Sequence, residues 1–395
     1  MKKILMVAAL AAMGAGAAPV VEITSVQQQY PWTNTVDITY TSTGIASNNT
    51  YYVVFKAQDS AGKEIGVITN DLKVSQGSTW VAQWQPPFNV RYENCTMTPY
   101  VYKGGMDDYM IVDLETWKVT FEGMSTQAAS NAKYNQGDYK TKKLVFRKID
   151  AGDYIIGDDG TPTAGDYALN TRHTVKIPKP YYMSIFSCTE DQWRRIVGDS
   201  TASTALPKAS ISYNQIRGSA GAGAKPTTGI MANLNAKTKA AGFTNGEGFD
   251  LPTESMWEIA ARAGVTTRFQ SGDTLNGREK YSWVATNSGN TRHEVGTKDP
   301  NPWGLYDVHG NVWSHIRDVS RNKTVDLKTI TEQCENGLMP ITSGRSGYIV
   351  MRGGGYSDTP NNAGDSRNWL SNGWYTWTTG QTGGHVGFRI AYIPD

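Results

Sequence analysis

Aromatic and small polar residues are concentrated in residues 356–386, near the end of the chain. Tyr and Trp give a binding surface rigid contact area at low entropic cost, while Asn, Ser and Gly adapt their hydrogen bonds to a ligand. The candidate ligand-binding residues are Tyr356, Asp358, Asn361, Asn362, Arg367, Asn368, Trp369, Trp374, Tyr375, Trp377 and His385. The four aromatic residues among positions 369–377 could also stack on sugar rings. For any single aromatic residue, packing beneath the loops explains its presence about as well.

Sulfur and carboxylate chemistry has weaker support in the sequence. The three cysteines, Cys95, Cys188 and Cys334, show no CxxC or Cys/His spacing typical of zinc. We expect Cys188 to be a buried free thiol, although a bridge between Cys188 and Cys334 remains open. Glu254 and Glu258 lie four residues apart, as a metal pair on a helix could. Carboxylates are also favoured in the first turn of a helix, and we prefer that explanation.

The composition excludes several classes of protein. Hydrophobic residues make up 39% of the 395 residues and charged residues 19%, which excludes a disordered chain and a membrane-embedded one. The net charge is +2 and no run of Lys or Arg concentrates it, so we expect no nucleic-acid partner.

Residues 1–17 have the features of a signal peptide. Lys2 and Lys3 precede a short apolar run at residues 4–13, and Ala15 and Ala17 provide a small-x-small cleavage site. A short buried helix would explain the apolar run alone. No later apolar run is long enough to span a membrane. We therefore expect an exported protein, whether periplasmic, on the cell surface or secreted.

Periodicity divides the mature chain into two domains. Residues 18–123 contain about seven short runs typical of strands, separated by turn residues, which predicts an immunoglobulin-like β-sandwich. Residues 124–140 are polar and are predicted to be a linker. The second domain is predicted over residues 141–395, with one helix beginning after Thr189 and another running from Thr253 to Gly264. Almost no helical periodicity follows residue 265.

Five motifs of the second domain occur in the order found in one known family. They are residues 180–198, 249–262 (FDLPTESMWEIAAR), 302–313 (PWGLYDVHGNVW), 352–356 (RGGGY) and 387–391 (GFRIA). Together they resemble the formylglycine-generating enzyme, or sulfatase-modifying factor, family. The resemblance implies an α+β fold related to C-type lectins. Within these motifs we expect Trp257, Trp303, Tyr306 and Trp313 to be core anchors.

The resemblance also implies a copper(I) site made by two cysteines that follow the RGG motif. In this chain Asp358 stands in the first position, and Ala363 or Ser366 in the second. No cysteine follows Cys334, and oxygen ligands replace thiolates poorly around copper(I). We therefore do not expect copper or the family's oxidase reaction.

A weak calcium site is the one metal site that the resemblance leaves open. Asp307, Gly310 and Val312 match part of the family's calcium-binding segment, but Ser314 replaces its glutamate. His315 follows, in place of an aromatic residue, and we expect it to be a surface substitution.

These observations favour an exported, non-catalytic protein that binds a glycan or a protein ligand through residues 356–386. The layout also resembles proteins diversified by retroelements, which vary residues between an RGG motif and a terminal GFR strand. The alternative is a formylglycine-generating oxidase, or a related enzyme, that uses a centre without cysteine.

Overall fold

The computed structural model divides the chain into two compact units, Met1–Met106 and Asp107–Asp395. The described residues are 20–28, 35–44, 50–60, 64–74, 79–84, 95–104, 108–123, 126–157, 172–199, 204–243, 248–265, 267, 269–272, 276–319, 335–340, 348–358 and 377–394. The predicted signal peptide lies outside them.

The first unit consists of two three-stranded antiparallel sheets. One sheet contains β1 (Val20–Gln28), β2 (Val36–Thr43) and β5 (Thr79–Trp84), and the other contains β4 (Glu64–Val74), β3 (Thr50–Gln58) and β6 (Thr96–Gly104). Side chains of β2 alternate between buried and half-buried positions, as the sequence alternation predicts. Residues from both sheets, among them Tyr40 and Phe55, share one hydrophobic core.

The boundary predicted between the domains was wrong. β7 (Tyr109–Asp113) and β8 (Val119–Glu122) were expected in the first domain, but β7 pairs with β9 (Lys143–Ile149) of the second unit. Residues 124–140 are not a linker either, since they contain α1 (Gln127–Tyr134) and α2 (Gly137–Thr141). The four apolar residues of β7 are all buried, and such a run does not reveal which sheet it joins.

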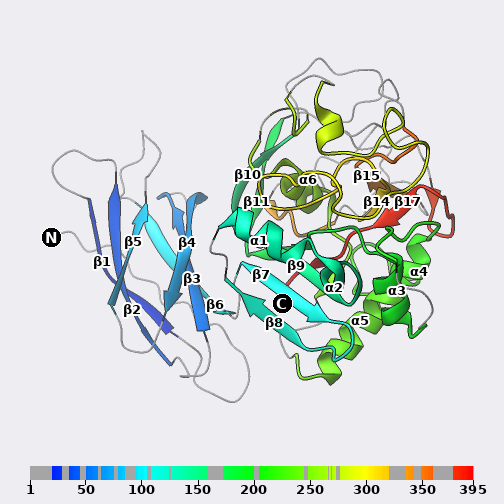
Figure 1. The fold of residues 1–395 in the computed structure, drawn as a ribbon. Coiled ribbons are helices and arrows are strands. Elements are labelled where there is room, and N and C mark those ends of the chain that lie inside the picture. The colour runs from blue at the N-terminus through cyan, green and yellow to red at the C-terminus, as the bar shows by residue number, and fades with distance from the viewer. Residues whose placement is uncertain are drawn as a thin grey trace. The chain divides into compact units, whose positions relative to one another are not determined.

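The second unit is a sheet-rich mixture of strands and helices (Figure 1). Its largest sheet has the order β13 (Phe249–Asp250), β18 (Ala391–Tyr392), β12 (Tyr181–Ser184), β9, β7, β8. A four-stranded sheet has the order β16 (Trp377–Thr378), β15 (Tyr348–Arg352), β14 (Trp313–Val319), β17 (Val386–Phe388). β10 (Gly152–Ile156) and β11 (His173–Ile177) form a separate pair. The helices are α3 (Glu190–Val197), α4 (Tyr213–Arg217), α5 (Gly229–Ala240), α6 (Glu254–Arg262) and the 3-10 turn η3 (Arg278–Lys280).

Both predicted helices are present. α3 begins with the expected capping box, in which the Thr189 hydroxyl accepts from the Gln192 backbone and the Gln192 side chain accepts from the Thr189 backbone. Thr253 caps the start of α6, where its hydroxyl accepts from the Met256 N–H. The helix ends where Ala263 and then Gly264 take positive φ angles. α6 lies among β10, β14 and β15 (Figure 1).

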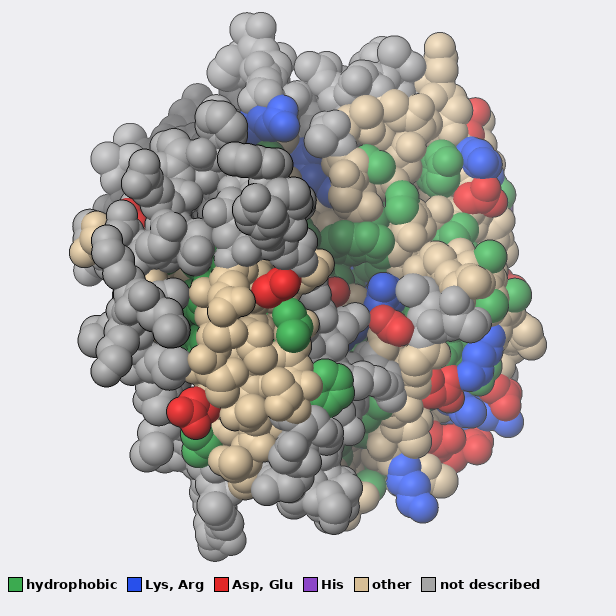
Figure 2. All heavy atoms as spheres, turned by 90° about the vertical axis from the view of Figure 1, so that its left-hand side faces the viewer, with side chains coloured by type: hydrophobic (Ala, Val, Ile, Leu, Met, Phe, Trp, Pro, Cys, Tyr) green, Lys and Arg blue, Asp and Glu red, His purple; other side chains and the backbone are tan. Residues whose placement is uncertain are grey.

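The motif aromatics belong to the core, as predicted. Trp257, Tyr306 and Trp313 are buried, and Trp303 is partly buried against the cluster that contains Trp257. None of the described helices is long and apolar enough to cross a membrane. On the face drawn in Figure 2, the described basic and acidic side chains are intermixed.

Candidate functional site

Three of the sequence motifs meet in one sheet. β14 carries Trp313 and lies between β15, which ends at Arg352, and β17, which precedes Arg389. Ser314 is opposite Arg352 on the antiparallel side and opposite Gly387 on the parallel side. The residues that flank the carboxy-terminal segment, defined as residues 356–386, are thus fixed to a single central strand.

Trp313 brings the two ends of this segment together. Its backbone N–H donates to the carbonyl of His385 at 2.8 Å. A Cβ on Gly355 would lie 3.1 Å from Cδ1 of Trp313 and 3.5 Å from Cβ of His385. Gly355 therefore occupies a narrow space between the tryptophan and the far end of the segment, where glycine permits a close approach.

Asp358 is bonded within the protein. Its carboxylate accepts from the Gly355 N–H at 2.6 Å, and its carbonyl accepts from the Ala285 N–H at 3.2 Å. Burial raises the pKa of Asp358 above its usual range, against the opposing effects of the Gly355 N–H, the His385 charge and a hydrogen bond from the Trp313 side chain. These contacts hold Asp358 in place within the protein. The sequence analysis had predicted only that Asp358 contacts a ligand.

Tyr356 is held by its backbone and leaves its ring half-buried. Its N–H donates to the Asn311 carbonyl at 2.8 Å, and its carbonyl accepts from the Ser288 hydroxyl at 2.7 Å. Sequence reasoning missed Ser288, because nothing in its local sequence indicates contact with a residue so distant in the chain. Asn311 belongs to a recognised motif, although its role at Tyr356 was not predicted.

The structure brings together Tyr356, Asp358 and His385 of the candidate ligand-binding residues. Trp377 pairs through its backbone with Ile349 of β15, which places it on the opposite side of β15 from Trp313. The other candidates lie outside the described residues: Asn361, Asn362, Arg367, Asn368, Trp369, Trp374 and Tyr375.

Arg352 anchors the start of the segment in the core. Its guanidinium lies 3.2 Å from Glu254 and 2.8 Å from Glu258, and it sits over the ring of Trp257. Burial alone would raise the pKa of Glu258, but Arg352 and Arg262 hold it below its usual range. The two glutamates therefore serve as ion-pair partners of arginine, which explains their spacing better than a metal site or the helix dipole.

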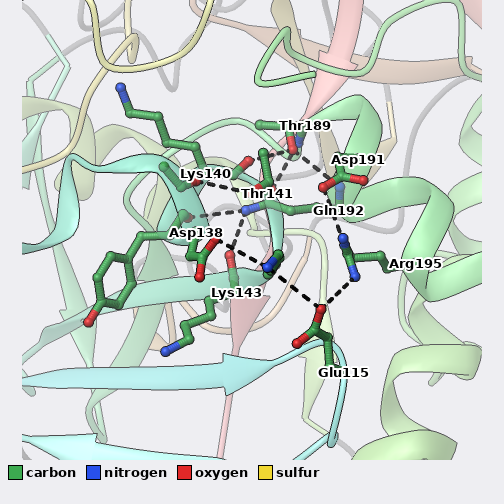
Figure 3. A network of polar contacts seen from close by, with 12 residues as sticks. Glu115, Asp138, Lys140, Thr141, Lys143, Thr189, Asp191, Gln192 and Arg195 are labelled. Atoms are coloured by element: carbon green, nitrogen blue, oxygen red, sulfur yellow. Dashed lines mark hydrogen bonds and ion pairs between the residues drawn. The ribbon is translucent and has the colours of Figure 1, made fainter. Parts of the chain in front are cut away.

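A polar network links the start of α3 to α2 and to β9 of the six-stranded sheet (Figure 3). The Gln192 side chain donates to the Lys143 carbonyl at 2.7 Å, and the Thr189 hydroxyl donates to the Lys140 carbonyl at 2.8 Å. The preceding residue, Cys188, donates its N–H to Phe388 of β17. Cys188 itself is a buried free thiol, as predicted, so it forms no bridge with Cys334.

The described residues do not fit a calcium ion at Asp307. Asp307 is buried, and its Oδ2 accepts from the Gly296 N–H. Burial raises its pKa, and the nearby cations Arg389 and Lys140 oppose that effect. A single carboxylate facing two cations is a poor donor set for a divalent ion, which prefers several oxygen ligands. Among the described residues, no group of three or more His, Cys, Asp or Glu side chains could hold a metal.

His315 is not the surface residue that the sequence predicted. It is fully buried, with Nε2 3.0 Å from the Ile211 carbonyl and its ring edge-on to Tyr213. Burial lowers its pKa to about 4, so the imidazole is neutral near pH 7. The position still holds a buried ring, which the family resemblance implied through its aromatic residue.

The second unit is thus an α+β domain in which the motif strands lie beside a buried tryptophan, Trp313. Over residues 132–393 the chain matches the sulfatase-modifying factor enzyme 1-like domain, and it belongs to that family.

Individual relatives cover only parts of the chain. It is 30% identical over 116 residues to the serine/threonine-protein kinase pkn1 of Chlamydia pneumoniae, covering 29% of this chain and 17% of that protein. It is 35% identical over 91 residues to the formylglycine-generating enzyme of Mycobacterium tuberculosis, covering 19% and 28%. The matched stretches thus span less than a third of these relatives. Among solved structures, Treponema denticola variable protein 1 aligns with a TM-score of 0.48 and 22% identity over 64% of this chain and 96% of that one.

Proposed function

We propose that this protein is an exported, non-catalytic binding protein whose carboxy-terminal segment presents its aromatic and Asn-rich residues to a glycan or protein ligand. The observation that carries the proposal is that Asp358 and His385, which lie near the two ends of the segment, both contact Trp313. A rigid core holds both ends of a segment whose residue types are those of binding surfaces. The further proposal that retroelements diversify this segment requires a reverse transcriptase and a template copy near the gene.

The chemistry at Asp358 supports binding over oxidation. The family resemblance implies a copper-binding cysteine at this position, but a carboxylate stands there and is bonded to Gly355 and Trp313. A soft copper(I) ion requires sulfur ligands, and the three cysteines of the chain all precede residue 335. We propose that binding requires neither copper nor calcium.

The first unit suits a role in presentation. Its two antiparallel sheets around a shared core support the immunoglobulin-like assignment, and domains of this kind space or display their neighbours. Export follows in this proposal from the predicted signal peptide and is tested by finding the mature amino terminus near Ala18 in the exported fraction.

The decisive experiment is a screen of the whole protein against glycan and surface-protein arrays. We expect a ligand whose binding is lost in Trp374→Ala or Trp377→Ala and is unchanged by EDTA. If both variants bind the ligand as tightly as the wild type does, the site lies elsewhere.

A parallel assay tests the oxidase alternative. A sulfatase-derived peptide containing cysteine is incubated with the protein, copper and oxygen, and aldehyde formation is measured. We expect none, and turnover would overturn the binding proposal.

A further inference from the structure

The carboxylate of Asp358 links three parts of the chain that are distant in sequence. It accepts from Gly355 at the start of the carboxy-terminal segment, is hydrogen-bonded by the Trp313 side chain on β14, and faces the charge of His385 at the far end. The Asp358 backbone adds a bond from its own N–H to the Gly355 carbonyl, at 3.2 Å, and one from Ala285. These contacts close a tight turn against the tryptophan.

Trp313 contacts one end of the segment through its backbone and the other through its side chain. His385 accepts from the Trp313 backbone, and the next residue, Val386, donates to Gly383 across a turn. Asp358 binds the indole side of the same tryptophan. Among the described residues, the groups that act on its carboxylate are therefore Gly355, Trp313 and His385, of which only His385 is ionisable.

We propose that Asp358 is a positioning residue that clamps the start of the carboxy-terminal segment against Trp313, whose backbone in turn holds His385 at the far end. The effect of Asp358 on ligand binding rests on the proposed binding function, whereas the contacts that it makes do not. Tyr356 and His385, held in place before the ligand arrives, bind it without first losing conformational freedom, so loss of the clamp weakens binding. The clamp itself exists whether or not the ligand is a glycan or a protein.

The test follows two N–H groups of the full-length protein by NMR as the pH is lowered from neutral to about 3, the range in which carboxyls titrate. The Gly355 amide and the Trp313 indole resonances should shift with one common midpoint. Asp358→Asn, which removes the charge at nearly constant shape, should abolish the shift. His385→Gln should move the midpoint to higher pH, because the imidazolium charge opposes protonation of the carboxyl.

His385→Gln leaves the hydrogen bonds from Gly355 and Trp313 to Asp358 in place, so it remains informative if Asp358→Asn does not fold. An unchanged midpoint in His385→Gln, or an indole resonance that does not titrate, would overturn the clamp. Failure of the array screen would overturn the binding function and leave the titration result intact. Where a ligand is found, Asp358→Asn should lower the affinity for it by about tenfold, because the binding residues are no longer held in place beforehand.

Discussion

The space around Gly355 and Gly384 determines whether either position tolerates a side chain. A Cβ on Gly355 would lie 3.1 Å from Cδ1 of Trp313, so the indole would have to move, whereas a Cβ on Gly384 would meet nothing closer than the Tyr356 hydroxyl at 3.8 Å. We predict that Gly355→Ala lowers the free energy of unfolding by about 1–3 kcal/mol, as overpacking does. Gly384→Ala is the matched control and should change it by less than about 0.5 kcal/mol. Chemical denaturation measures both, and equal losses would show that Gly355 is not confined by Trp313.

His315 makes stability depend on pH. The folded state keeps its imidazole neutral, with the pKa lowered to about 4, while the unfolded chain takes up the proton near the ordinary value of about 6.5. The unfolded state therefore binds more protons, and stability falls as the pH drops through this window. The full loss is roughly 3 kcal/mol below pH 4. Denaturation of the wild type and His315→Gln at pH 7 and 4.5 should show a steeper loss in the wild type, and parallel losses would contradict the assignment.

Ion pairs between elements fix the start of the carboxy-terminal segment. Arg352 joins β15 to α6 through two buried glutamates. Arg352→Met removes one of the two arginines that pair with Glu258 among the described residues, so we predict a loss of about 3–5 kcal/mol in unfolding free energy. Lys142→Met breaks an exposed pair with Asp138 and should have almost no effect. A small loss in Arg352→Met would mean that packing against Trp257, rather than charge, holds β15.

Short-range signals in the sequence predict elements well and contacts between elements poorly. The capping bonds of Thr189, Gln192 and Thr253 join neighbours within four residues, so the starts of α3 and α6 could be predicted. The contact between Ser288 and Tyr356 depends on the whole fold, and no local pattern indicates it. The cysteine-free character of the site, in contrast, could be predicted from the sequence alone.

Along the chain, the boundary between the two units lies before β7, and sequence patterns misplace it. The polar residues 124–140 suggested a linker and the end of a domain, yet β7 and β8 complete the largest sheet of the second unit. An antiparallel strand can join any sheet whose edge is available, so its partner follows from the tertiary fold rather than from its own residues. The family match begins at residue 132 and likewise omits both strands.

This boundary leads to a prediction for two shortened chains. A chain of residues 107–395 retains β7 beside β9 and should fold cooperatively. A chain of residues 141–395 loses the buried partners Tyr109, Met110, Ile111 and Val112 and exposes the edge of β9. Each buried apolar side chain contributes about 1.5–3 kcal/mol, so this loss is comparable to the whole stability of a domain. We expect a cooperative thermal transition only for the longer chain, and dye binding to exposed apolar surface only for the shorter one. A cooperative transition in residues 141–395 would show that β7 and β8 are dispensable to the second unit.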